Sequence, residues 1–183
     1  MTQTAHADDG LHARAFVDML AKQIISILTT KTTATAREAA FADLLDTHAN
    51  MRRIARFTLG ATVRTISDKD FMRFQNLFRQ LVVKVYANRL TDYRDETLEI
   101  LGVQQKGRNF IVASQIIFAT GRPPINVDWW VIRKKNGRYS LFDLRVLGIW
   151  LAQEQRETFT SVLRNNGSDI EVLLQHLQKQ ISD

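Results

Sequence analysis

Residues 97–147 read TLEILGVQQKGRNFIVASQIIFATGRPPINVDWWVIRKKNGRYSLFDLRVL, and this stretch decides the fold. β-Branched and aromatic residues dominate it, and turn signals interrupt it at Lys106-Gly107, at residues 121–124 and at Asn136-Gly137. Because these connections are short, successive strands should be neighbours and run antiparallel. The pattern predicts a four-stranded meander with strands at 97–105, 109–119, 125–135 and 139–147, after which Gly148 ends the sheet.

Helical periodicity surrounds this predicted sheet. Apolar residues recur at steps of three and four over 11–28, 37–48, 67–86, 152–163 and 168–181, and a short helix is expected over 51–59. Asn50 and Ser67 have the side chains of N-caps, and Gly60 is a natural helix stop. Ser168 and Glu171 have the spacing of a capping box. The chain is therefore predicted to be α+β, with N-terminal and C-terminal helices packed on the meander sheet around an apolar cavity.

The expectation of a cavity comes from the strands. A sheet covered on one side should alternate apolar and polar residues, but both alternating sets along 109–119 and 127–132 contain large apolar side chains. Either helices cover both faces, or one face lines an internal cavity. The sequence leaves both arrangements open, and an ordinary core is the simpler of the two.

Composition and motifs exclude several classes of site. The 183 residues are 45% apolar and 24% charged, and no apolar run approaches the roughly 20 residues of a membrane span. The chain has no cysteine, and its four histidines lack metal-ligand spacing, so neither a metal nor a cofactor is expected. No nucleophile elbow, P-loop or dinucleotide fingerprint occurs. Asp143 lies among apolar strand residues: it has a raised pKa if it is buried there, and otherwise it points out from the opposite face or caps a neighbouring loop.

The N-terminus resembles the end of an export signal. Ala5-His6-Ala7 has the small-x-small pattern of a signal-peptidase site, although no apolar segment precedes it. Residues 1–10 are therefore expected to be a signal-peptide remnant or an added tail. Residues 11–183 are expected to form a single domain.

Positive charge is concentrated in the middle of the chain. Residues 52–94 carry ten Lys and Arg against three Asp and Glu, a surplus of seven within a net charge of +6. Such a surface suits an anionic lipid, a nucleic acid or an acidic protein, and it also fits a solvated helical face. Nucleic acid is the least suitable partner, because no exposed aromatic residues for base stacking are evident among these arginines.

A motif in the same region resembles one family. Ile54-Ala55-Arg56 is followed by Leu59-Gly60, and Tyr86-Ala87 follows with Leu90 and Tyr93. With Phe142-Asp143-Leu144, Gly148, Arg156 and Phe159, these residues resemble the MlaC/toluene-tolerance family of periplasmic lipid carriers, over about residues 41–177. Four positions depart from the family pattern: Asn50 replaces an Asp, Val63 a Trp, Trp150 a Ser and Gln155 a Tyr.

The resemblance implies a function as well as a fold. It implies a monomeric periplasmic carrier, not an enzyme, that shields phospholipid acyl chains and shuttles lipid between an outer-membrane lipoprotein complex and an inner-membrane ABC transporter complex. Contact with those complexes would be transient, and no nucleic acid would be bound. A hopanoid or other polycyclic lipid is an alternative cargo. A small-molecule enzyme, using Asp143 and Tyr139 in a cone-like fold, is the second alternative.

Candidate site residues follow from the periodicity and from this general design. Arg56 and Arg64 are expected at the mouth, near a lipid headgroup. The residues expected to line the cavity are Phe57, Phe74, Phe78, Leu81, Val85, Ile116, Phe118, Val127, Trp129, Val131, Phe142, Leu144 and Trp150.

Overall fold

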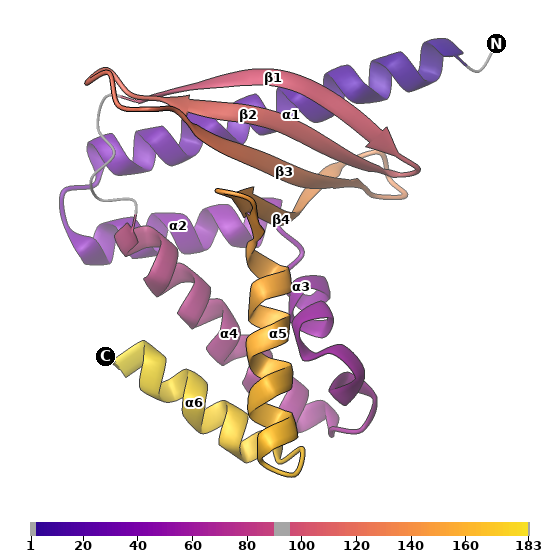
Figure 1. Ribbon diagram of the computed structural model, residues 1–183, viewed down its shortest axis with the longest axis vertical. Coiled ribbons are helices and arrows are strands. Elements are labelled where there is room, and N and C mark those ends of the chain that lie inside the picture. The colour runs from indigo at the N-terminus through magenta and orange to yellow at the C-terminus, as the bar shows by residue number, and fades with distance from the viewer. Residues whose placement is uncertain (1–2, 90–95, 183) are drawn as a thin grey trace.

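The fold was analysed in a computed structural model that describes residues 3–89 and 96–182 (Figure 1). Leu90 and Tyr93 of the family motif lie outside the described residues. The helices are α1 (Gln3–Thr30), α2 (Ala34–His48), α3 (Met51–Leu59), the 3₁₀ turn η1 (Gly60–Arg64), α4 (Asp68–Arg89), α5 (Leu151–Asn165) and α6 (Ile170–Ser182). The strands are β1 (Thr97–Lys106), β2 (Asn109–Ile117), β3 (Ile125–Arg133), β4 (Tyr139–Val146) and β5 (Ile149–Trp150).

The sheet is the predicted antiparallel meander with one strand more. Its order is β1-β2-β3-β4-β5, so the expectation of four strands is wrong. The chain does not leave the sheet at Gly148, because Leu147 and Gly148 both have positive φ and turn it back for two further residues. Val146 then pairs with Ile149, and Arg145 pairs with Trp150.

Helix ends follow the predicted capping residues, with one exception. Asn50 accepts a hydrogen bond from the Arg53 amide at 3.0 Å, and Ser67 accepts one from the Asp70 amide at 3.1 Å. The predicted capping box at Ser168 is wrong: Ser168 has a φ of 63° and closes the turn after α5. Asp169 caps α6 in its place, accepting from the Glu171 amide at 2.9 Å.

α1 is longer than predicted. It runs from Gln3 to Thr30 and crosses the expected boundary between residues 10 and 11 without a break. Asp9, inside the expected tail, forms an ion pair with Arg133 at 3.1 Å. No described helix is both long enough and apolar enough to cross a membrane.

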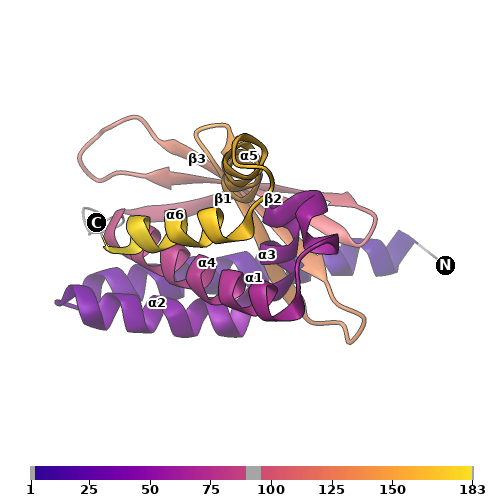
Figure 2. The same ribbon diagram turned by 90° about the horizontal axis from the view of Figure 1, so that it is seen from below.

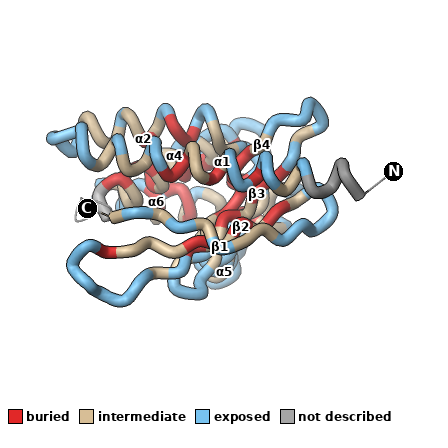
Figure 3. The backbone as a smooth tube through the Cα atoms, turned by 90° about the horizontal axis from the view of Figure 1, so that it is seen from above, coloured by how far each residue is buried: buried red, intermediate tan, exposed pale blue. Residues whose placement is uncertain are grey.

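Two separate hydrophobic cores hold the helices to the sheet. The first lies between α1 and one face of the sheet, here called the near face, and includes Val17, Leu20, Phe110, Val112 and Val131. The second lies among α2 to α6 and reaches the opposite, far face at Ile132 and Phe142. Figure 2 shows α1 and α2 to one side of the strands, and Figure 3 shows the buried residues concentrated between α1 and the sheet and within the helical group.

Two β-bulges decide which side chains belong to which core. In β1 the register shifts between Ile100 and Gly102, and Leu101 is left 53% exposed. In β4 both Phe142 and Asp143 lie opposite Trp130. Leu141 therefore faces α1, Phe142 faces the other helices, and Leu144 returns to the near face.

The buried carboxylate of Asp143 ties the helical group to this bulge. One of its oxygens accepts hydrogen bonds from the backbone amides of Leu144 and Ala152, both at 2.8 Å. Ala152 is in the first turn of α5, so Asp143 caps that helix from a strand. Burial raises the pKa of Asp143, and hydrogen bonds from the α5 amides oppose the rise. Asp143 therefore has both a raised pKa and a capping role.

We predict that Asp143→Ala lowers the free energy of unfolding by about 1–3 kcal/mol, because it leaves the amides of Leu144 in β4 and Ala152 in α5 without their acceptor. Urea unfolding followed by circular dichroism measures the loss. Asp143→Asn is the matched control, since its amide oxygen still accepts both hydrogen bonds and it should lose less. Equal losses in the two variants would contradict the capping role.

The raised pKa of Asp143 predicts a pH dependence with a defined sign. The folded protein holds this proton more tightly than the unfolded chain, so the contribution of Asp143 to stability falls as the pH rises from about 4 through the folded pKa. The unfolding free energy of the wild type minus that of Asp143→Asn should therefore decrease over this window. A difference that grows with pH would contradict the assigned cause.

Candidate functional site

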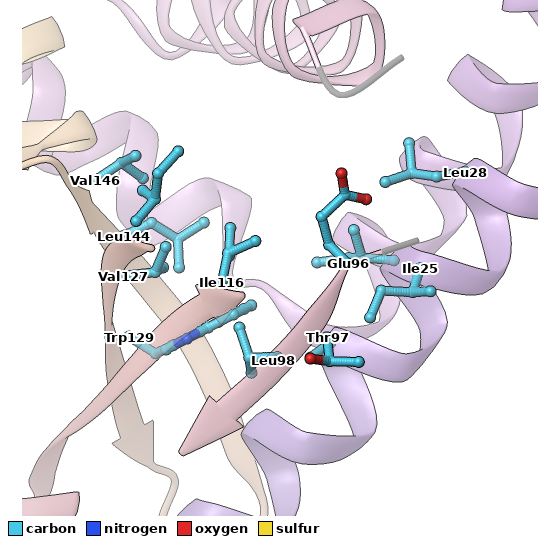
Figure 4. A pocket seen from close by; sticks show the side chains of 13 residues that line it. Ile25, Leu28, Glu96, Thr97, Leu98, Ile116, Val127, Trp129, Leu144 and Val146 are labelled. Atoms are coloured by element: carbon cyan, nitrogen blue, oxygen red, sulfur yellow. The ribbon is translucent and has the colours of Figure 1, made fainter. Parts of the chain in front are cut away.

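An apolar pocket lies between the C-terminal half of α1 and the end of the sheet where β1 and β3 begin and β2 and β4 end. It encloses about 150 Å³. Figure 4 shows side chains from α1 and β1 facing side chains from β3 and β4 across it. The residues that line it are Ala21, Ile24, Ile25, Leu28, Glu96, Thr97, Leu98, Ile116, Ile125, Val127, Trp129, Leu144 and Val146.

The pocket wall is almost entirely hydrocarbon. Eleven of the thirteen lining residues are apolar, and the two exceptions, Glu96 and Thr97, are adjacent at the start of β1. In Figure 4 the Glu96 carboxylate lies on the Leu28 side of the pocket, opposite Val146 and Leu144. No Lys or Arg is among the described residues that line the pocket. Such a wall suits an apolar ligand with its polar group at one edge.

The indole N–H of Trp129 has a hydrogen-bond acceptor within the protein. The indole nitrogen of Trp129 donates to the Ser114 hydroxyl at 2.9 Å, and that hydroxyl donates to the Val127 carbonyl at 2.7 Å. Ser114 is 1% exposed and Trp129 4%. Because this chain of hydrogen bonds uses the indole N–H, Trp129 presents only hydrocarbon to the pocket.

α1 is fixed to the sheet at the end away from the pocket. The Tyr139 hydroxyl donates to the Asp9 carbonyl at 3.0 Å, and Arg14 donates to the Ile100 carbonyl at 3.3 Å. Ala13, Val17 and Leu20 are fully buried against the strands. Beyond Ala21 the side chains of Ile24, Ile25 and Leu28 are only partly buried. The pocket is the space left where α1 is no longer packed tightly on the sheet.

Only some of the residues predicted to line a cavity meet here. Ile116, Val127, Trp129 and Leu144 line the pocket. Val131 is buried further along the same near face, in the core under α1. Phe118 lies just beyond β2, with the Arg122 guanidinium 4.5 Å from its ring centre. Trp150 lies near Trp130, at a ring-centre distance of 5.7 Å.

The phenylalanine stripe of α4 lies in the helical core and not in the pocket. Phe74 and Phe78 stack at 5.8 Å, and both rings meet Phe159 of α5 edge-on. Phe57, Leu81, Val85 and Phe142 belong to the same core or pack against it. The sequence placed Phe142 and Leu144 in one cavity, but the β4 bulge sends them to opposite faces of the sheet.

The two arginines predicted at the mouth lie on the helical group. Arg56 is exposed on α3, with its guanidinium 5.6 Å from the ring centre of Phe71. Arg64 is exposed at the end of η1. Neither lines the pocket. A different arginine of the helical group, Arg79 of α4, binds Asp46 of α2 through two hydrogen bonds.

The α1 side of the pocket was missed at the sequence level. Ile24 and Leu28 fall on one face of the helix predicted over 11–28, but the predicted cavity residues include none from this helix, and the helical period does not distinguish Ile25. Leu98, Ile125 and Val146 were within predicted strands but had no feature that separated them from other apolar strand residues. The sequence shows that these residues are apolar. It does not show that they lie together, because that depends on how α1 crosses the sheet.

The paired residues of the enzyme alternative do not converge. The Tyr139 hydroxyl is bonded to the Asp9 carbonyl on the near face, and burial raises its pKa. The Asp143 carboxylate is bonded to the α5 amides on the far side of the bulge. In the described part of the chain, no group of three or more His, Cys, Asp or Glu side chains could hold a metal ion.

Comparisons with known proteins agree with this architecture. A family model described as MlaC protein matches residues 18–179. The intermembrane phospholipid transport system binding protein MlaC of Haemophilus influenzae is 26% identical over 143 residues, which are 76% of this chain and 65% of that protein. The chain therefore spans about two thirds of the length of this curated relative. A phospholipid-binding protein from Ralstonia solanacearum, solved in complex with a phospholipid, has the same fold with a TM-score of 0.80 at 19% identity, covering 92% of this chain and 96% of that one.

We predict that Ser114→Ala lowers the free energy of unfolding by about 1–3 kcal/mol, because it leaves the buried indole N–H of Trp129 without an acceptor. Denaturant unfolding measures the change. Ser140→Ala is a matched control: Ser140 is 2% exposed, and its hydroxyl has no hydrogen-bond partner among the described residues. The control should be neutral or stabilising, and equal losses in both variants would contradict the account of the pocket wall.

Proposed function

The chain belongs to the MlaC protein family, and we propose that it binds a phospholipid with the acyl tails in the pocket between α1 and the sheet. The observation that carries this proposal is the pocket wall, where eleven of thirteen lining residues are apolar and the two polar ones share one edge. The solved phospholipid complex of the Ralstonia protein, which has the same fold, supports the choice of ligand.

A carrier role follows from the cost of exposing lipid tails to water. Exposure to water costs about 0.8 kcal/mol of free energy for each methylene group. For a lipid with about 30 methylenes, the total cost of full exposure is on the order of 24 kcal/mol. A protein that moves such a lipid must shield most of this surface. The hydrocarbon wall supplies the shield without chemistry on the lipid, and we propose no catalytic role for any residue.

The pocket must widen to receive a tail. Its volume of about 150 Å³ is below the roughly 300–1,000 Å³ of typical small-molecule sites. α1 is anchored at its N-terminal end through Asp9 and Arg14, whereas Ile25 and Leu28 at the other end are only partly buried. We infer that the C-terminal half of α1 moves away from the sheet as the lipid enters.

The headgroup would remain at the polar edge of the pocket. Thr97 supplies a hydroxyl there, and Glu96 supplies a carboxylate that suits the ammonium of a zwitterionic headgroup better than an additional anion. Arg56 and Arg64 would take part only through a second surface on the helical group, because they are not among the residues that line the pocket.

We place the activity in the periplasm, as a monomeric shuttle between an outer-membrane lipoprotein complex and an inner-membrane ABC transporter complex. The Haemophilus relative is an intermembrane phospholipid transport system binding protein, which supports the part of this proposal that concerns transport between membranes. A hopanoid cargo stays a prediction. Organic extraction of the purified protein followed by lipid mass spectrometry tests both cargoes, and a protein that neither carries lipid nor takes it up would overturn the carrier role.

We predict that Ile25→Glu lowers the amount of bound phospholipid at least tenfold, because it places a carboxylate against the acyl tails. Native mass spectrometry of the intact complex gives the lipid-to-protein ratio. Ser26→Glu makes the same charge change on the exposed side of the same helix turn and should leave the ratio unchanged. Equal loss in both variants would show that charge on α1, and not the pocket, controls binding.

A further inference from the structure

The turn between β4 and β5 has an unsuitable residue for its backbone. Val146 pairs with Ile149, so Leu147 and Gly148 form a two-residue hairpin turn with φ values of 51° and 86°. Positive φ at both positions is the pattern of a type I′ turn, which favours Asn-Gly, Asp-Gly or Gly-Gly. A bulky side chain rarely adopts positive φ. Turn geometry therefore gives no reason for a leucine at position 147.

Packing gives no reason either. Leu147 is 71% exposed and Ile149 is 50% exposed, so most of the Leu147 surface and half of the Ile149 surface are in contact with water. A strained backbone that holds an exposed apolar side chain points to a contact between this side chain and a partner of the protein.

This turn lies at the rim of the lipid pocket. Val146, the residue before Leu147, lines the pocket. The Leu147 amide donates to the carbonyl of Asn126 at 3.4 Å, and the neighbours of Asn126, Ile125 and Val127, also line the pocket. Leu147 and Ile149 therefore extend the apolar wall past the mouth.

The size of the patch identifies its partner. Two aliphatic side chains offer roughly 60–120 Å² each, whereas a stable protein interface needs about 800 Å² from each partner. The patch is too small to hold a protein but sufficient for shallow, reversible contact with the acyl region of a bilayer.

We propose that the β4–β5 turn, with Leu147 at its tip and Ile149 beside it, inserts into the surface of a lipid bilayer and holds the pocket mouth against it. The inference rests on the proposed function, since it concerns how lipid reaches the same pocket. A tail that passes along Leu147 and Ile149 into the pocket is covered by hydrocarbon throughout. The contact is weak enough for the carrier to leave after exchange.

Leu147→Asn tests this directly, because it converts the turn to the favoured Asn-Gly sequence and removes the apolar side chain. We expect its unfolding midpoint to be unchanged or higher. Partition onto phosphatidylcholine vesicles in flotation assays should fall about tenfold, which corresponds to about 1.4 kcal/mol. Transfer of a fluorescent phospholipid between vesicles should slow by a similar factor, while the amount of lipid bound per protein stays the same.

Met72→Gln is the matched control. Met72 is 55% exposed on α4 and does not line the pocket, so its loss should affect neither partition nor transfer. The vesicles carry no net charge, so that the protein is not adsorbed electrostatically through the basic hairpin tips at the other end of the sheet. These tips carry Arg108, Arg133, Lys134 and Lys135.

Two results would overturn the inference. One is a wild-type protein that carries lipid yet does not partition onto vesicles, which would show that the turn does not insert into a bilayer. The other is a Leu147→Asn variant that partitions and transfers as the wild type does. Absence of bound lipid in the wild type is a different failure: it would overturn the proposed function, while vesicle partition would still report on the turn.

Discussion

The bulge in β4 is the constraint on which the rest of the structure depends. It places Phe142 and Asp143 together on the far face, where the ring enters the helical core and the carboxylate caps α5. It also returns Leu144 and Val146 to the near face, where they line the pocket. Without the extra residue, strict alternation would exchange these faces beyond Leu141. The helical group and the pocket thus share one local feature.

α1 covers most of the near face, with Leu44 of α2 in the same core, and the pocket lies under the C-terminal half of α1. α1 packs tightly from Ala13 to Ala21 and is anchored by polar contacts at Asp9 and Arg14. Its remaining turns, at Ile24, Ile25 and Leu28, are only partly buried, and the space between them and the strands is lined by hydrocarbon. Stability is concentrated at one end of the helix, which leaves the other end available for ligand entry.

Much of the fold could be predicted from the sequence, because strand alternation, turn glycines and helix caps are local signals. Four strands and the caps at Asn50 and Ser67 follow from them. The site could not be predicted in the same way. The Phe74–Phe78 stripe and the Ile24–Leu28 face have the same helical period, and nothing local says that the first fills a core while the second borders a cavity. The β4 bulge has no sequence signal that we recognised, so Phe142 and Leu144 were assigned to one surface.

The central claim, that acyl tails occupy the pocket under α1, is tested most directly by the three tryptophans. Trp129 lines the pocket, whereas Trp130 and Trp150 contact each other on the far side of the sheet. A protein with Trp129 alone, made by Trp130→Phe and Trp150→Phe, should lose most of its fluorescence when it binds a phospholipid brominated along its acyl chains. A protein that retains only Trp130 and Trp150 should be quenched far less. The reverse order, or no quenching of Trp129 by a lipid that is bound, would contradict the account.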